Sequence, residues 1–290
     1  MGSKHSTEPQ KGRTVIVTGA SSGIGYHTAL ELGKQGAHVI CLARDEKRGQ
    51  AALEKMKEQV PEGKYELEIC DLADLSSVKE FTDRFKKRNI GLHTLVNNAG
   101  IMMPPERQLS KDGFEMQWAT NHLGHFALTG QLLESMKGTY NPRVVNVTSI
   151  LLWQGKLRQG VPIDFCPSPE AYSAYFTYCS TKQANLIYSR ELAKRHGWIK
   201  VTAAHPGVVS SGLQKYAFSS LTPLMPNASW GAAQSLRAIT DADAFTGSFF
   251  GPFFVVAGKP VRSWIPTRCN NNTLGTELWN ASVKATKVEY

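Results

Sequence analysis

The sequence has no long apolar run and no leader segment. No stretch reaches the roughly 18 consecutive apolar residues that a membrane-spanning helix requires. The chain also does not open with the basic, then apolar, segment that directs secretion. With 41% hydrophobic and 20% charged residues, its composition is that of a globular chain and not of a disordered one. We therefore expect a soluble, cytoplasmic protein without a transmembrane segment.

Paired cysteines are also absent. The cysteines are odd in number and lie far apart, and none forms a Cys-x-x-Cys pair. This spacing predicts neither a zinc site nor a disulfide framework, so we expect reduced thiols. His122 and His125 stand close together but lack further metal-type neighbours, and no metal site is expected. The cysteines are Cys41, Cys70, Cys166, Cys179 and Cys269.

Charges of both signs are mixed along the chain. There are 33 Lys and Arg against 24 Asp and Glu, which gives a formal net charge of +9. Acidic and basic residues alternate in segments such as 83–88, which is typical of a solvated helix face. No basic stripe carries interleaved aromatics, so nucleic-acid binding is not expected. An anionic small molecule is a simpler partner for the excess positive charge.

The first 12 residues are polar, and we expect them to form a flexible tail. Residues 1–6 fit the loose pattern for myristoylation at Gly2, although the same start is common in expression tags. A single acyl chain binds a membrane only weakly. The sequence thus allows weak membrane association at most, and it leaves acylation of Gly2 open.

From residue 13 onward, short β-branched runs alternate with amphipathic helical segments. The predicted strands are 13–18, 37–42, 64–70, 92–97, 143–148, 199–204 and 249–256, and the predicted helices are 24–35, 46–59, 75–89, 111–137, 172–196 and 228–240. Parallel strands joined by helical crossovers form a doubly wound sheet. We expect one Rossmann-type α/β domain over 13–290, with about seven parallel strands and helices on both faces. Ligands of such sheets bind at the carboxyl ends of the strands.

A glycine-rich turn joins the first predicted strand to the first helix. Glycine lets the backbone turn tightly and approach a pyrophosphate closely, and the helix N-terminus that follows offers free N–H groups. The strand before the turn and the helix after it are the context that such a motif requires. We therefore predict dinucleotide binding at Gly19, Ser21, Ser22, Gly23, Ile24 and Gly25.

The end of the second strand indicates which dinucleotide binds. Sites for NAD place a carboxylate there to hold the ribose 2′-hydroxyl. This chain has Arg44, whose planar guanidinium suits a 2′-phosphate, while Asp45 is placed to cap the next helix. We therefore predict NADP(H). Further cofactor contacts are expected after the third and fourth strands, at Asp71, Leu72, Asn98, Ala99 and Gly100.

Tyr178 and Lys182 lie four residues apart on a predicted helix, and therefore on one face of it. A free phenol has a pKa near 10, and a neighbouring ammonium group lowers that pKa. Such a tyrosine can give a proton to a carbonyl oxygen or take one from an alcohol. Ser149 ends the fifth strand, where its hydroxyl could hydrogen-bond the same oxygen.

Two further segments complete the predicted site. Asn121 is predicted inside a helix, where asparagine is unfavourable, and this indicates a kink or a water site. The segment after the sixth strand is expected to form a wall beside the nicotinamide. Its residues at the site are Pro206, Gly207, Val209 and Ser211.

Together these motifs resemble the short-chain dehydrogenase/reductase family. The motifs that match in order over about residues 12–257 are the run from Thr18 to Gly25, residues 97–100, Asn121, Ser149, the Tyr178/Lys182 pair and Pro206-Gly207. Residues 121–126, Arg44-Asp45 and residues 250–252 are similar to its retinol-dehydrogenase-like branch. Many members of that branch begin with a membrane-anchoring helix, from which this chain departs.

The resemblance implies a role for each catalytic candidate. Tyr178 would be the acid/base, and Lys182 would lower its pKa and hold the nicotinamide ribose. Ser149 would orient the carbonyl, and Asn121 would support a water that relays protons from Lys182. Ser211 matches a hydroxyl position near the nicotinamide carboxamide.

Two segments, 150–177 and 211–227, are rich in apolar and aromatic residues and follow strands that carry the predicted site. We expect Trp153 and Tyr216, together with Ser149 and Tyr178, to contact a lipophilic aldehyde, ketone or alcohol of retinoid, steroid or aromatic type. The alternative for these aromatics is packing in a minor core or a subunit contact. The alternative function is a non-catalytic NADP(H)-binding sensor or scaffold on the same fold. The oligomeric state stays open between monomer and homo-oligomer.

Overall fold

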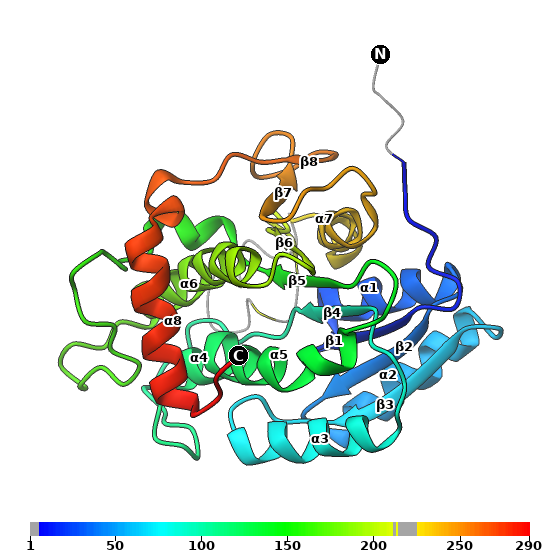
Figure 1. Ribbon diagram of the computed structural model, residues 1–290, viewed down its shortest axis with the longest axis horizontal. Helices are drawn as coiled ribbons and strands as arrows, with labels where there is room; N and C mark the ends of the chain where they lie inside the picture. The colour runs from blue at the N-terminus through cyan, green and yellow to red at the C-terminus, as the bar shows by residue number, and fades with distance from the viewer. Residues whose placement is uncertain (1–5, 211–212, 214–224) are drawn as a thin grey trace.

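Eight strands form one sheet in the computed structural model, which describes residues 6–210, 213 and 225–290. The strand order is β3-β2-β1-β4-β5-β6-β7-β8, and β8 alone pairs antiparallel (Figure 1). The strands are β1 (Thr14–Thr18), β2 (His38–Ala43), β3 (Lys64–Ile69), β4 (Thr94–Asn97), β5 (Arg143–Val147), β6 (Lys200–Ala204), β7 (Ser248–Pro252) and β8 (Pro260–Arg262). The predicted Rossmann-type sheet is confirmed, with eight strands where about seven were expected.

Helices connect the strands and cover both faces of the sheet (Figure 1). The long helices are α1 (Gly23–Lys34), α2 (Glu46–Gln59), α3 (Leu75–Lys87), α5 (Gly124–Met136), α6 (Ala174–Arg195), α7 (Ala228–Thr240) and α8 (Asn272–Thr286). Side-chain caps define where several of them begin. The Asp45 carboxylate accepts a hydrogen bond from the Arg48 N–H at 2.8 Å, and Ser173 caps α6.

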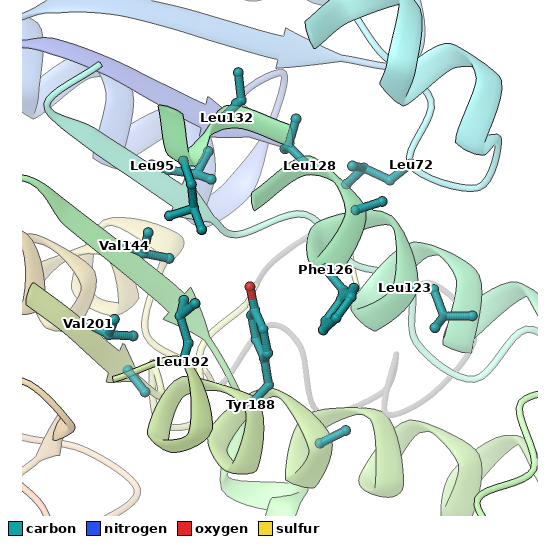
Figure 2. Packing of buried hydrophobic residues seen from close by; sticks show 14 of the residues in the cluster. Leu72, Leu95, Leu123, Phe126, Leu128, Leu132, Val144, Tyr188, Leu192 and Val201 are labelled. Atoms are coloured by element: carbon teal, nitrogen blue, oxygen red, sulfur yellow. The ribbon is translucent and has the colours of Figure 1, made fainter. Parts of the chain in front are cut away.

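Alternation along the strands divides the core into two clusters. Val15 and Val17 pack with α1, α2 and α7, whereas Ile16 packs with α3, α5, α6 and α8. In the second cluster Phe126 of α5 and Tyr188 of α6 meet, with ring centroids 5.5 Å apart (Figure 2). Because helices cover both faces, the strands carry nearly continuous apolar runs. Polar groups that could bind a ligand are therefore expected at the carboxyl ends of the strands and not on the faces of the sheet.

Three elements differ from the sequence-based expectation. The helical region expected over 111–137 begins at Met116 with the short α4 (Met116–Trp118) and continues through a π-helical turn, η1 (Ala119–Leu123). The strand expected over 249–256 ends at Pro252, because the chain reverses there and returns as β8. The C-terminal helix α8 was not predicted, and it packs on α6.

Residues 6–12 also differ from the flexible tail expected over 1–12, of which 1–5 lie outside the described residues. The Glu8 N–H donates to the Thr240 carbonyl at 2.7 Å. The Glu8 carboxylate accepts a hydrogen bond from Arg143 at 2.6 Å, and the Arg143 side chain is 0% exposed. A buried guanidinium requires a counter-charge, and this requirement holds the segment against the base of the sheet.

Within the part of the chain that the structure describes, no helix is long and apolar enough to cross a bilayer. All five cysteines are unpaired, as the sequence predicted. No group of three or more His, Cys, Asp or Glu side chains is arranged to hold a metal ion among the described residues.

Candidate functional site

A cavity of about 610 Å³ lies at the carboxyl ends of the parallel strands, where doubly wound sheets bind their ligands. Its walls come from the segments that follow β1 to β6 and from one face of α6. The walls mix exposed backbone and small side chains with apolar side chains. A cavity of this size and composition suits an extended ligand with charged and apolar parts.

Every described residue that the sequence analysis assigned to a cofactor lines this cavity. These residues are Gly19, Ser21, Ser22, Gly23, Ile24, Gly25, Arg44, Asp71, Leu72, Asn98, Ala99, Gly100, Tyr178, Lys182, Pro206, Gly207 and Val209. Ser211 lies outside the described residues. These residues lie in the segments that follow β1, β2, β3, β4 and β6, and on α6. The strand order brings them together at one edge of the sheet.

The glycine-rich turn requires its glycines for two reasons. Gly19 has a φ of +66°, in the left-handed region that favours glycine. A Cβ on Gly25 would lie 2.4 Å from the Asn98 amide nitrogen and 2.4 Å from the Gly19 carbonyl oxygen. The turn is tied to the neighbouring strand end, because the Thr18 hydroxyl accepts hydrogen bonds from the Asn98 and Ala99 N–H groups at 2.8 Å each. The arrangement leaves the N-terminus of α1 facing the cavity.

Two arginines lie at the end of β2. Arg44 lines the cavity, and Arg48 lines it too, four residues further along the chain in the first turn of α2. Arg48 also lines an adjoining groove of about 390 Å³ together with Lys55. Arg48 was not among the predicted contacts, although its i, i+4 relation to Arg44 at a helix start was a usable signal. The pair makes this end of the cavity suited to a phosphate.

Tyr178, Ser149 and Lys182 line the other part of the cavity. The Tyr178 side chain is 3% exposed and its hydroxyl shares a hydrogen bond with that of Ser149. Burial raises the pKa of Tyr178 to about 12, against a smaller lowering by that hydrogen bond. Lys182 was expected to lower this pKa, but burial of the phenol has the larger effect and raises it. The phenol is therefore protonated at neutral pH and can act as a proton donor.

Lys182 lies under the cavity on α6, and burial lowers the pKa of its ammonium group to about 8. Its Nζ donates to the Val147 carbonyl at 3.4 Å and lies 5.7 Å from the Tyr178 ring centroid. A Cβ on Gly100 would lie 3.3 Å from this Nζ and 3.2 Å from Asn121 Oδ1. Glycine at position 100 thus keeps open the space between the lysine and the asparagine.

Asn121 lies inside the π-helical turn η1, which accounts for the irregularity predicted there. Its side chain does not line the cavity but holds two neighbouring segments. Oδ1 accepts from the Ile101 N–H at 2.8 Å, and Nδ2 donates to the Ile101 carbonyl at 3.0 Å. Nδ2 also lies 3.1 Å from the Thr181 hydroxyl, next to Lys182. A π-turn inside a helix is a frequent mark of a functional site.

An apolar cluster packs around Tyr178. Its members are Met102, Met103, Leu151, Ala174, Tyr175 and Leu213. The two methionines were not predicted to lie at the site, although only Ile101 separates them from the Asn98–Gly100 segment. Trp153 is not among the described residues that line the cavity, and it stacks on Trp264 at 5.4 Å between ring centroids. Tyr216 lies outside the described residues.

The chain is similar to proteins of known family. A family profile described as short chain dehydrogenase matches residues 13–160. Human retinol dehydrogenase 12 is 37% identical over 281 residues, covering 93% of this chain and 85% of that protein. Human polyprenol dehydrogenase is 36% identical over 218 residues, covering 72% of this chain and 64% of that protein.

Solved structures resemble the fold. The crystal structure of an uncharacterised protein from Mycobacterium paratuberculosis superposes with a TM-score of 0.82 at 37% identity, covering 98% of this chain and 97% of that chain. A short chain dehydrogenase from Escherichia coli complexed with NADPH has a TM-score of 0.69 at 20% identity, covering 84% of this chain and 97% of that chain. At 20% identity the likeness concerns the fold alone.

Proposed function

Because the chain belongs to the short-chain dehydrogenase family, we propose that it transfers a hydride between NADP(H) and a lipophilic aldehyde, ketone or alcohol. The observation that carries this proposal is that Ser149, Tyr178 and Lys182 line the same cavity as the glycine-rich turn and Arg44. One cavity therefore offers groups suited to a phosphorylated dinucleotide and groups suited to a reacting carbonyl.

Each residue at the site has a chemical task in the proposed reaction. When bound, the nicotinamide supplies or accepts the hydride. The protonated Tyr178 donates its proton to the substrate oxygen during reduction and takes it back during oxidation. Ser149 donates a hydrogen bond to the same oxygen and stabilises the charge that develops on it. The Lys182 ammonium favours the phenolate that remains and would hold the ribose hydroxyls, with Asn121 keeping the Ile101 segment beside it.

The preference for NADP(H) follows from the groups at the end of β2. Arg44 and Arg48 both line the cavity there, and no carboxylate ends the strand. Asp45 follows directly, but its side chain accepts the Arg48 N–H and caps α2. A guanidinium pair makes charge-assisted hydrogen bonds to a 2′-phosphate, which offers several anionic oxygens, whereas the 2′-hydroxyl of NAD(H) offers one neutral oxygen.

We expect an Arg44→Ala variant to lose about 30-fold in kcat/KM with NADPH, because a charge-assisted hydrogen bond contributes about 2 kcal/mol. Efficiency with NADH should change less than about twofold, since that cofactor has no 2′-phosphate. Steady-state kinetics with both cofactors measure the difference. Lys47→Ala is the matched control, since Lys47 is exposed in the first turn of α2, three residues after Arg44, and does not line the cavity. Equal efficiency of the unmodified protein with NADH and NADPH would contradict the assignment.

The lipophilic substrate follows from the apolar cluster at Tyr178. Methionine side chains adapt to irregular apolar shapes. Met102 and Met103 pack in one cluster with Tyr178, and Met102 also lines the cavity. Relatives of this chain are named for retinol and polyprenol, which are lipid alcohols. The non-catalytic alternative is not favoured, because the complete Asn121, Ser149, Tyr178 and Lys182 set has no evident use in a sensor.

The test of this function is a carbonyl panel with NADPH, monitored by loss of the nicotinamide absorbance. The panel contains retinal, a steroid ketone, an aromatic ketone and medium-chain aldehydes, with a charged sugar aldehyde as the polar control. We expect turnover of at least one lipophilic carbonyl and none of the sugar. Tight NADPH binding without turnover of any member would support the non-catalytic alternative instead.

The pH dependence of reduction should follow Lys182. Its pKa is lowered to about 8, so the ammonium form is present below that pH and is lost above it. We expect kcat/KM for carbonyl reduction to be level between pH 6 and 7.5, and to fall about tenfold per pH unit above pH 8. The residual activity of Lys182→Arg should lack this fall, because a guanidinium keeps its proton throughout the range. An efficiency that rises from pH 7.5 to 9.5 would contradict the role of the lysine.

A further inference from the structure

His125 is a buried histidine that the site described above does not use. His125 lies one turn after Asn121, in the first turn of α5, and it is 3% exposed. Both ring nitrogens have polar partners. Nδ1 lies 3.2 Å from the Asn121 carbonyl oxygen, and Nε2 lies 2.9 Å from the Thr18 hydroxyl. The ring therefore stands between the π-helical turn and the end of β1.

The partners determine which nitrogen carries the proton. A backbone carbonyl can only accept a hydrogen bond, so the proton is on Nδ1 and is donated to the Asn121 carbonyl. Nε2 then accepts the Thr18 hydroxyl proton at 2.9 Å, in preference to the Val96 carbonyl oxygen, which lies 3.3 Å from the same hydroxyl. The Thr18 oxygen in turn accepts the Asn98 and Ala99 N–H groups at 2.8 Å each. Every hydrogen-bonding capacity of the ring and of this hydroxyl is thus used.

The chain of hydrogen bonds stays the same across the working pH range. Burial lowers the pKa of His125 to about 3, and the nearby Lys182 lowers it further, against a raising by the Asn121 carbonyl. The imidazole is therefore neutral at neutral pH, and its two hydrogen bonds form a fixed connection. On one side the ring bonds to Asn121, whose side chain bonds to Ile101 and to Thr181, the neighbour of Lys182. On the other side the ring bonds to Thr18, which precedes the glycine-rich turn.

We propose that His125 is a positioning residue that couples the Asn121 turn to the glycine-rich turn at the end of β1. Through its two nitrogens, one ring sets the place of Asn121 relative to the Asn98–Gly100 wall. The expected effects on cofactor binding and turnover rest on the function proposed above, whereas the coupling itself does not.

Two substitutions separate the two ends of the ring. His125→Asn places an amide nitrogen near the position of Nδ1, so it keeps the hydrogen bond to Asn121 and loses Thr18. His125→Gln reaches the position of Nε2, so it keeps Thr18 and loses Asn121. We expect His125→Asn to raise the Kd for NADPH about tenfold, with kcat at saturation reduced less than about threefold. We expect His125→Gln to lower kcat about tenfold, with the Kd for NADPH unchanged.

The matched control is His122→Asn. His122 lies one turn earlier, is also buried, and bonds to Ser282 of α8 at 2.9 Å, away from the cavity. It should lose thermal stability like the His125 variants but keep both kcat and the Kd for NADPH. If the His125 variants match this control in stability, kcat and Kd alike, His125 is a core histidine and the coupling is overturned.

Amide hydrogen exchange tests the coupling without cofactor or substrate. His125→Asn should speed exchange at the Asn98 and Ala99 amides, which depend on the Thr18 hydroxyl, and leave η1 unchanged. His125→Gln should speed exchange in η1 and leave the two amides unchanged. Equal exchange in both variants would overturn the inference even if NADPH binds. A wild-type protein that binds no NADPH but shows this split would instead overturn the proposed function alone.

Discussion

Tyr178→Phe is expected to lower kcat for carbonyl reduction by at least about 1,000-fold, because general acid catalysis of this kind contributes up to about 10⁴-fold. The substitution removes one hydroxyl and keeps the ring that packs against the apolar cluster. The Kd for NADPH should therefore stay within about threefold of the wild-type value. Steady-state turnover of the best panel substrate and NADPH fluorescence titration give the two numbers. A loss of turnover with NADPH binding retained is the result expected if Tyr178 is the proton donor of an enzyme.

Tyr188→Phe is the control for that experiment. Tyr188 lies on the same helix and is also 3% exposed, but it packs against Phe126 in the core (Figure 2). Its hydroxyl bonds to that of Tyr290 at 2.8 Å. Its loss should cost stability and leave kcat unchanged. If Tyr178→Phe kept more than about a tenth of the wild-type turnover, another proton donor would have to be sought. Ser149 would be the first candidate, because it already bonds the tyrosine hydroxyl.

Glu8→Gln is expected to lower the free energy of unfolding by about 3 kcal/mol, because it removes the partner of a buried charge. Glu8 Oε1 accepts from Arg143 at 2.6 Å and from the Asn141 amide at 2.6 Å. Arg143 keeps hydrogen bonds to the Ala238 and Asp241 carbonyls, so the loss falls at the lower end of the range for broken buried pairs. Urea denaturation at pH 7 without added nucleotide measures it.

A double variant checks that the cost arises from the buried charge. Glu8→Gln combined with Arg143→Met removes both members, and we expect much of the lost stability to return. The surface pair of Lys79 and Asp83 is the contrasting case, since both side chains are largely exposed. Asp83→Asn should leave the denaturation midpoint nearly unchanged. A loss below about 1 kcal/mol for Glu8→Gln would mean that water reaches Arg143 after all.

The predictions that succeeded from sequence rest on short-range patterns. The alternation of β-branched runs with helical periods led to the doubly wound sheet, since each period depends only on near neighbours. The positions of the site residues followed, because the carboxyl ends of parallel strands meet at one edge. Tyr178 and Lys182 were placed on one helix face by their four-residue spacing. Arg44 was chosen because it follows the end of the second strand. The roles of these residues in catalysis remain proposals until the variants are measured.

Where the expectation differed, the deciding partner is distant in sequence. Residues 6–12 looked like a tail because their composition is polar, but Glu8 pairs with Arg143, 135 residues away. Trp153 looked like a substrate contact, but Trp264 stacks on it from the segment after β8. The pKa of Tyr178 was expected to fall beside a lysine, but the depth of burial raises it. Polarity and spacing carry no information about such partners or about burial.

By itself, the sequence determined the class of fold, the edge of the sheet that holds the site and the chemical groups offered there. These depend on local periodicity, turn chemistry and the fixed handedness of parallel connections. Only the tertiary structure decided which groups are buried, which charges are paired and how Asn121 is held by Ile101, Thr181 and His125. Those outcomes depend on contacts between residues far apart in the chain, and such contacts exist only once the whole core has packed.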